Sequence, residues 1–167
     1  FYIFMKTVNF IYKDRKYPVD FNILKKYSTY FYVINQFIDL QLVDEFDSIT
    51  DITDEIVNDF IQYFEKDDIE LNNNNVFSIK YLSTKYEIIN MTQIVNEYIS
   101  DNYNDLIDDI LSFSSIDINK KHCHQLNIEH EEIISYHISE YIEDDRLLSI
   151  PISSLYRIFS NFFTRNN

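Results

Sequence analysis

Residues 17–31 read YPVDFNILKKYSTYF and are the most informative about the fold. Pro18 favours extended backbone in the residue before it, and Asp20 is of a type that commonly caps the start of a helix. The side chains that then recur at helical spacing are Phe21, Leu24, Tyr27, Ser28 and Phe31. The stretch therefore predicts a strand that passes at Asp20 into an amphipathic helix over residues 21–31.

Upstream of this stretch, residues 5–12 have the period of a strand, because Val8, Phe10 and Tyr12 alternate with polar neighbours. The polar residues 13–16 predict a turn, so the chain is expected to open with a β-hairpin. Downstream, the pattern over residues 32–49 is less regular. We expect a second short helix there and a strand near residues 40–43.

From residue 53 onward the sequence predicts helices. Thr53 is suited to cap a helix, since its side chain can accept a hydrogen bond from the first turn. The apolar stripe of that helix is Ile56, Val57, Phe60, Ile61 and Phe64. Asn75 and Asn90 are expected to start the next two helices in the same way.

The last third of the chain continues in helices. Further helices are predicted over residues 103–113 and 129–142, with a serine-rich loop over residues 112–121 between them. After Pro151 a last helix is expected, capped by Ser153. The whole pattern predicts an α/β protein of the α-rich α+β class, with a helical cluster flanked by a small sheet and a C-terminal helical extension.

Glycine is absent from all 167 residues. Phosphate-binding loops such as GxGxxG and the GxSxG turn of hydrolases need a residue without Cβ, so these classes of site are excluded. Left-handed turns must use Asn or Asp instead, and the candidates are Asp14, Asp67, Asp68 and residues 72–75. Because the chain holds 14 Tyr and 14 Phe, much of its core is expected to be aromatic.

The net charge is −14, which opposes binding to nucleic acid or to anionic membranes. Acidic runs such as Asp108–Asp109 and Glu131–Glu132 are expected on solvated helix faces. Cys123 is the single cysteine, so no internal disulfide can form and a reducing compartment, the cytoplasm or the nucleus, is expected. Apolar runs fall short of the roughly 20 residues of a membrane span.

The one group of residue types that resembles a metal site is His122, Cys123 and His124, followed by His130 and His137. Zinc needs three or four ligands that converge tetrahedrally, and the spacing here does not supply them. We expect no metal, no cofactor and no enzymatic activity, and we expect His137 to be a partly buried, hydrogen-bonded residue. A metal- or thiol-dependent enzyme around residues 122–124 is the alternative from another class.

Three groups of residues resemble the BTB/POZ family. Ile23, Leu24, Ser28 and Phe31 match its first helix, although Asp20 stands where that family commonly has His. Phe60 and Ile61 with Tyr63 and Phe64 are similar to the end of a later helix, without the usual Gly. Residues 82–88, LSTKYEI, resemble the Ala-x-Lys-Tyr helix. The resemblance covers residues 5–102, and residues 103–167 resemble a shortened BACK segment, most closely at residues 155–158.

The resemblance implies a protein-interaction adaptor that dimerises or docks onto a cullin-type ubiquitin ligase scaffold. Self-association is expected through residues 5–12 and 21–31. An adaptor of the SKP type, which shares this core and binds F-box proteins, is the related alternative. Met5 is a candidate start of the chain; residues 1–4 are then extraneous, and the alternative is that they belong to a truncated upstream segment.

The resemblance also implies a cullin-facing surface. Val43, Asp44 and Glu45 stand where cullin-binding members carry an apolar-x-Glu element. Tyr63 and Phe64 stand where the family supplies a tyrosine to the same surface. An apolar anchor beside an aromatic residue within a polar rim is a common way to concentrate binding energy. The alternative is that Val43 is an ordinary strand residue and that Phe64 belongs to the core.

Overall fold

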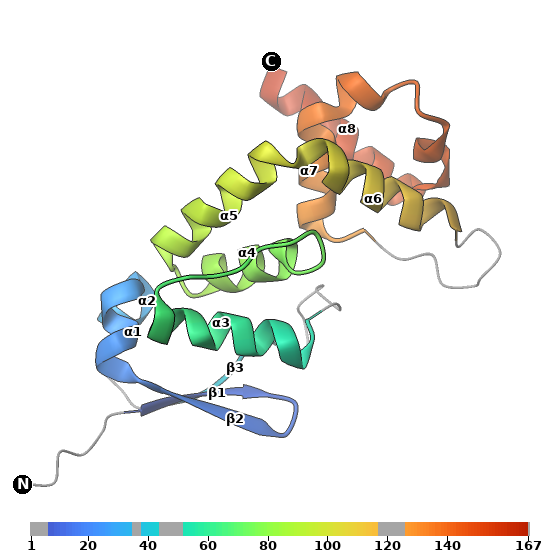
Figure 1. Ribbon diagram of the computed structural model, residues 1–167. Helices are drawn as coiled ribbons and strands as arrows, with labels where there is room; N and C mark the ends of the chain where they lie inside the picture. The colour runs from blue at the N-terminus through green and yellow to red at the C-terminus, as the bar shows by residue number, and fades with distance from the viewer. Residues whose placement is uncertain (1–6, 35–37, 44–51, 117–125, 167) are drawn as a thin grey trace, which may run out of the picture. The chain divides into compact units, whose positions relative to one another are not determined.

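The computed structural model describes residues 7–34, 38–43, 52–116 and 126–166 (Figure 1). The chain divides into two compact units, Phe1–Ser100 and Asp101–Asn167. This division lies two residues before the boundary expected after residue 102. The predicted fold class is confirmed, because the described residues form a small three-stranded sheet and a larger number of helices.

The sheet of the first unit begins with the predicted hairpin. Strands β1 (Thr7–Tyr12) and β2 (Arg15–Asp20) pair antiparallel, and Lys13 takes a left-handed conformation in the turn between them. Strand β3 (Asp39–Gln41) pairs parallel with β1, which gives the order β2-β1-β3. Val8 and Phe10 on β1 are fully buried, so the strand alternation read from the sequence marks its core face.

The predicted single helix over residues 21–31 is wrong: Ser28 divides it into α1 (Phe21–Tyr27) and α2 (Thr29–Val33). The backbone of Ser28 is extended, and its hydroxyl oxygen accepts a hydrogen bond from the Phe31 N–H at 3.2 Å. The same hydroxyl donates to the carbonyl of Tyr86. Serine favours such local bonds over a continuous helix. Asp20 caps α1 as predicted, accepting from the Asn22 N–H.

Three longer helices complete this unit, namely α3 (Asp54–Lys66), α4 (Val76–Lys85) and α5 (Ile89–Asp101). Thr53 caps α3 as predicted, with its hydroxyl oxygen 3.3 Å from the Ile56 nitrogen. Asn75 precedes α4 but does not cap it through its side chain, because that amide bonds instead to the backbone of Asn72 and Glu70. Figure 1 shows α3 between the sheet and α4.

An aromatic cluster fills the space between the sheet and these helices. The ring of Phe10 on β1 contacts four other rings at centroid distances of 5.2 to 6.4 Å. The four rings belong to Phe31, Phe60, Phe64 and Tyr86. They come from α2, from α3 and from the residue that follows α4, so one strand residue connects most of the unit.

The second unit contains α6 (Tyr103–Ile116), α7 (Ile128–Tyr141), a 3₁₀ turn η1 (Asp145–Ser149) and α8 (Ile152–Asn166). Helix α6 continues through residues 112–116, where a loop was predicted, and the rest of that predicted loop lies outside the described residues. Ser153 is not a cap, because α8 already begins at Ile152, and the carbonyl of Pro151 accepts from the N–H groups of Ser154 and Leu155.

Unlike the first unit, the second has an aliphatic core. The apolar residues that recur at helical spacing on α6 are buried, and so are the isoleucines in the middle of α7, whereas Tyr141 is half-buried and Ile142 is 54% exposed. The buried side chains of α6 and α7 that form this core are Leu106, Ile107, Ile110, Leu111, Ile133, Ile134 and Ile138. Leu147 of η1 and Ile158 of α8 are buried with them. The helical periodicity in the sequence therefore identified the core faces correctly.

Phe10→Ala is expected to lower the free energy of unfolding of the first unit by about 3–5 kcal/mol, because it removes the ring that contacts all four other rings of the cluster. Tyr32→Ala is the control: Tyr32 is exposed on α2, and its truncation is expected to cost no more than about 0.5 kcal/mol. Urea denaturation followed by circular dichroism measures both. Equal losses in the two variants would contradict the central role of Phe10.

Candidate interaction surfaces and polar clusters

The five residues expected to face a cullin do not form one surface among the described residues. Val43 is half-buried in the bend that follows β3, and Asp44 and Glu45 lie outside the described residues. Tyr63 and Phe64 are 1% and 3% exposed. Burial, with the nearby charge of Asp67, raises the pKa of Tyr63 to about 12. Neither aromatic residue is accessible to a partner in this conformation, and the interpretation of Phe64 as a core residue is confirmed.

The surfaces expected to mediate self-association are also largely used within the first unit. Strand β1 is the central strand, with β2 on one side and β3 on the other, so its middle residues present no free edge. Phe21 and Leu24 of α1 and Phe31 of α2 are buried. Residues 5 and 6 lie outside the described part of the chain. Pairing through these apolar groups would therefore require the core to open.

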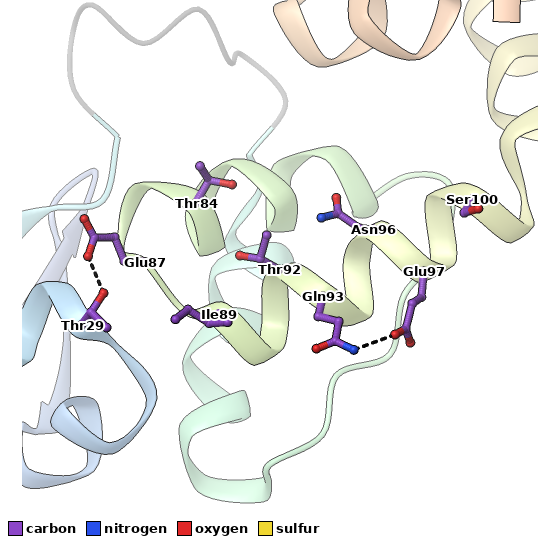
Figure 2. A pocket seen from close by; sticks show the side chains of 9 residues that line it. All are labelled: Thr29, Thr84, Glu87, Ile89, Thr92, Gln93, Asn96, Glu97 and Ser100. Atoms are coloured by element: carbon purple, nitrogen blue, oxygen red, sulfur yellow. Dashed lines mark hydrogen bonds between the residues drawn. The ribbon is translucent and has the colours of Figure 1, made fainter. Parts of the chain in front are cut away.

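The first unit carries an open groove of about 730 Å³ that sequence analysis did not identify. Its walls come from the start of α2, the end of α4 and one face of α5 (Figure 2). The residues that line it are Thr29, Thr84, Glu87, Ile89, Thr92, Gln93, Asn96, Glu97 and Ser100. On α5 these positions recur at helical spacing but are mostly polar, so no apolar stripe marked them in the sequence.

The groove combines one apolar side chain with many hydrogen-bonding groups. Ile89 is 63% exposed within it. The Thr29 hydroxyl donates to the Glu87 carboxylate, and the Gln93 amide donates to a Glu97 oxygen at 2.9 Å (Figure 2). Carboxylates and amides can bind the N–H groups of a peptide or a basic side chain. The arrangement suits an apolar anchor surrounded by polar contacts.

The histidine cluster shows no metal site in the part that the structure describes. Among the described residues no group of three His, Cys, Asp or Glu side chains could hold a metal ion, while residues 122–124 lie outside them. His137 stacks on Tyr103 at a centroid distance of 3.8 Å, and its Nδ1 lies 3.1 Å from Glu140. The prediction of a partly buried, hydrogen-bonded His137 is confirmed.

Glu131 contradicts the expectation that the acidic runs all lie on solvated faces, because it is only 2% exposed. Arg157 of α8 holds both of its carboxylate oxygens at 2.6 Å, through Nε and Nη2. This interaction raises the pKa of Arg157. The bidentate pair joins α7 to α8, and its partners are 26 residues apart, so no local pattern could have predicted it.

Arg146 forms a second charged cluster within this unit. Its guanidinium contacts Asp144 at 2.7 Å and Asp108 at 2.6 Å, and it also donates to Ser112. The hydrogen bonds from Arg146 lower the pKa of Asp144. Asp108 lies on an exposed face, as expected. Its contact with Arg146 connects α6 to η1, the turn before α8. Both clusters hold elements of the second unit together.

Comparison with known proteins assigns no family to this chain. No family model matches it, and no curated protein is significantly similar to it. None of the helices in the described residues combines the length and the apolar character needed to cross a bilayer.

Arg157→Ala should lower the melting temperature of the second unit, because it leaves the buried Glu131 carboxylate without its partner. Arg157→Lys keeps the charge but loses the bidentate geometry and should be intermediate. The comparison variant is Arg157→Ala with Glu131→Gln, in which the uncompensated charge is gone. Thermal melts should place this double variant above Arg157→Ala, and an Arg157→Ala melt equal to wild type would contradict the structural role.

Stability is expected to fall on acidification through the Asp144–Arg146 contact. Because the pKa of Asp144 in the folded chain lies below the unfolded value of about 3.9, the contribution is complete above that value. It is lost as the pH falls through the folded pKa. Melting temperatures of wild type and Asp144→Asn should therefore differ at pH 6 and converge near pH 2. A constant difference over this range would show that the carboxylate charge is not responsible.

Proposed function

We propose that the chain is a non-enzymatic protein-interaction adaptor whose first unit is a BTB/POZ-like domain and whose second unit is a BACK-like helical segment. The observation that carries the proposal is the open groove of the first unit, with exposed Ile89 among hydrogen-bonding side chains. A surface of this composition is typical of a modest protein interface. It lacks the convergent acid, base and nucleophile that catalysis would need.

The arrangement of the first unit supports the proposal. A small sheet flanks a cluster of helices, as the resemblance implies. The motif residues also have roles of their own: Leu24 and Phe31 are core residues, and Ser28 caps α2. Because these roles depend on spacing and not on one residue type, they are compatible with the low similarity to known sequences.

The partner we propose is a cullin-type ligase scaffold, with an F-box protein as the alternative partner of a SKP-type adaptor. The net charge of −14 favours partners with basic surfaces, because opposite potentials steer association. Val43 stays a candidate anchor, since it is half-buried and lies in the bend that follows β3. The cytoplasm or nucleus is the compartment in which such a partner would be met.

Ile89→Arg is expected to reduce capture of the partner at least about tenfold, because it replaces an exposed apolar anchor with a charge. Ile94→Arg is the matched control: it makes the same change on the same helix, at a position that is 38% exposed and does not line the groove. The measurement is affinity capture from the native cell with quantitative mass spectrometry. Cullin peptides that bind wild type and Ile94→Arg but not Ile89→Arg are the expected result.

Three outcomes would overturn this assignment. Capture that is unaffected by Ile89→Arg would exclude the groove as the binding surface. F-box proteins in place of cullin peptides would favour the SKP-type alternative, and zinc bound in stoichiometric amount to the purified chain would favour the enzymatic one.

A further inference from the structure

Helix α8 carries an apolar seam along one side. The seam consists of Ile152, Tyr156, Phe159 and Phe163, at positions i, i+4, i+7 and i+11. Ile152, Tyr156 and Phe163 are 85%, 73% and 58% exposed, and Phe159 is half-buried. This spacing is that of the a and d positions through which helices pair in coiled coils.

The contacts of α8 within its own unit use a different face. Ile158 and Ser154 are fully buried, and Arg157 between them in sequence bonds to Glu131 of α7. Further along, Arg165 donates to Ser135 at 3.1 Å. On a helical wheel these residues lie roughly 100–180° away from those of the seam, at about 100° per residue. Packing against α7 therefore leaves the seam uncovered.

The seam is also the part of an acidic chain where two copies can approach without repulsion. Residues 150–167 contain no Asp or Glu, whereas the whole chain has 28. The positions that flank the seam are uncharged: Ser153 and Ser160 on one side, Leu155 and Phe162 on the other. The two arginines of the helix, Arg157 and Arg165, are engaged with carboxylates of α7. The seam itself carries no charged side chain, so binding to it does not require a partner of opposite charge.

We propose that two copies of this chain associate through the α8 seam in a two-fold symmetric contact. A surface of aromatic and aliphatic groups that requires no charge partner is typical of homodimer interfaces, which are more apolar than contacts between different proteins. At roughly 200 Å² for a fully buried aromatic side chain, the three exposed residues supply about 400 Å² per copy and about 800 Å² in a pair. This area lies below the range of stable dimers, so the association is reversible at micromolar concentration.

This inference goes beyond the proposed adaptor function and does not depend on it. It concerns the second unit, whereas the groove that we propose for the partner lies on the first. It also gives self-association a surface other than β1 and α1, whose apolar groups are buried. A dimer formed at α8 would present two copies of the groove.

The test is sedimentation velocity of the full chain from about 1 to about 200 μM, a range that covers dissociation constants in the micromolar range. Wild type is expected to shift from monomer to dimer over this range. Tyr156→Glu and Phe163→Glu should each raise the dissociation constant at least about tenfold, because each places a charge in the seam. Asn161→Glu is the matched control, with the same added charge at an exposed position of α8 that lies outside the seam.

Circular dichroism melts establish that the variants are folded, and truncation to alanine, as Tyr156→Ala, provides a second readout if a glutamate variant is not. A monomeric wild type throughout the range would overturn the proposal, as would loss of the dimer in Asn161→Glu to the same extent as in Tyr156→Glu. A dimer that survives both seam variants would place the contact elsewhere and would equally overturn it.

Discussion

The packing of Phe10 against four other aromatic rings is the interaction on which the first unit depends. It joins the central strand to α2, to α3 and to Tyr86 after α4. Ring pairs of this kind contribute about 0.5–1.5 kcal/mol beyond the burial of their area. Tyr86 extends the cluster through polar contacts, since its hydroxyl donates to Gln41 of β3 and its carbonyl accepts from Ser28. The strand pairing and the break between α1 and α2 are thereby coupled to one core.

A chain without glycine must place other residues where the backbone turns left-handed. In the described residues these positions are Lys13, Asp67 and Glu87, of which only Asp67 has the short polar side chain that eases this conformation. For lysine and glutamate the cost is about 1–2 kcal/mol. Glu87 lies in the groove, and its carboxylate is bonded to Thr29 of α2. Core packing on either side therefore holds a strained residue at the surface that we propose for binding.

The second unit is organised by a different balance of forces. Its core is aliphatic, and the ion pair between Glu131 and Arg157 helps to set which side of α8 faces α7. An ion pair of this kind contributes to orientation as much as to stability, because its geometry admits few arrangements. The consequence is that α8 packs through Ser154 and Ile158 while its aromatic side remains outside. The ion pair that orients α8 against α7 thus leaves the apolar seam of α8 exposed.

Features that depend on neighbours along the chain could be predicted from the amino-acid sequence. The hairpin, the Thr53 cap and the buried faces of α3, α6 and α7 follow from periodicity and capping, which are local. Features that depend on partners far apart in the sequence could not be predicted, because they form only when the chain folds. Ser28 ends a helix because a carbonyl 58 residues away accepts its hydroxyl, and Glu131 is buried because Arg157 reaches it from another helix. The groove could not be predicted from the sequence for the same reason, since its polar side chains come together only when α2, α4 and α5 pack in the folded unit.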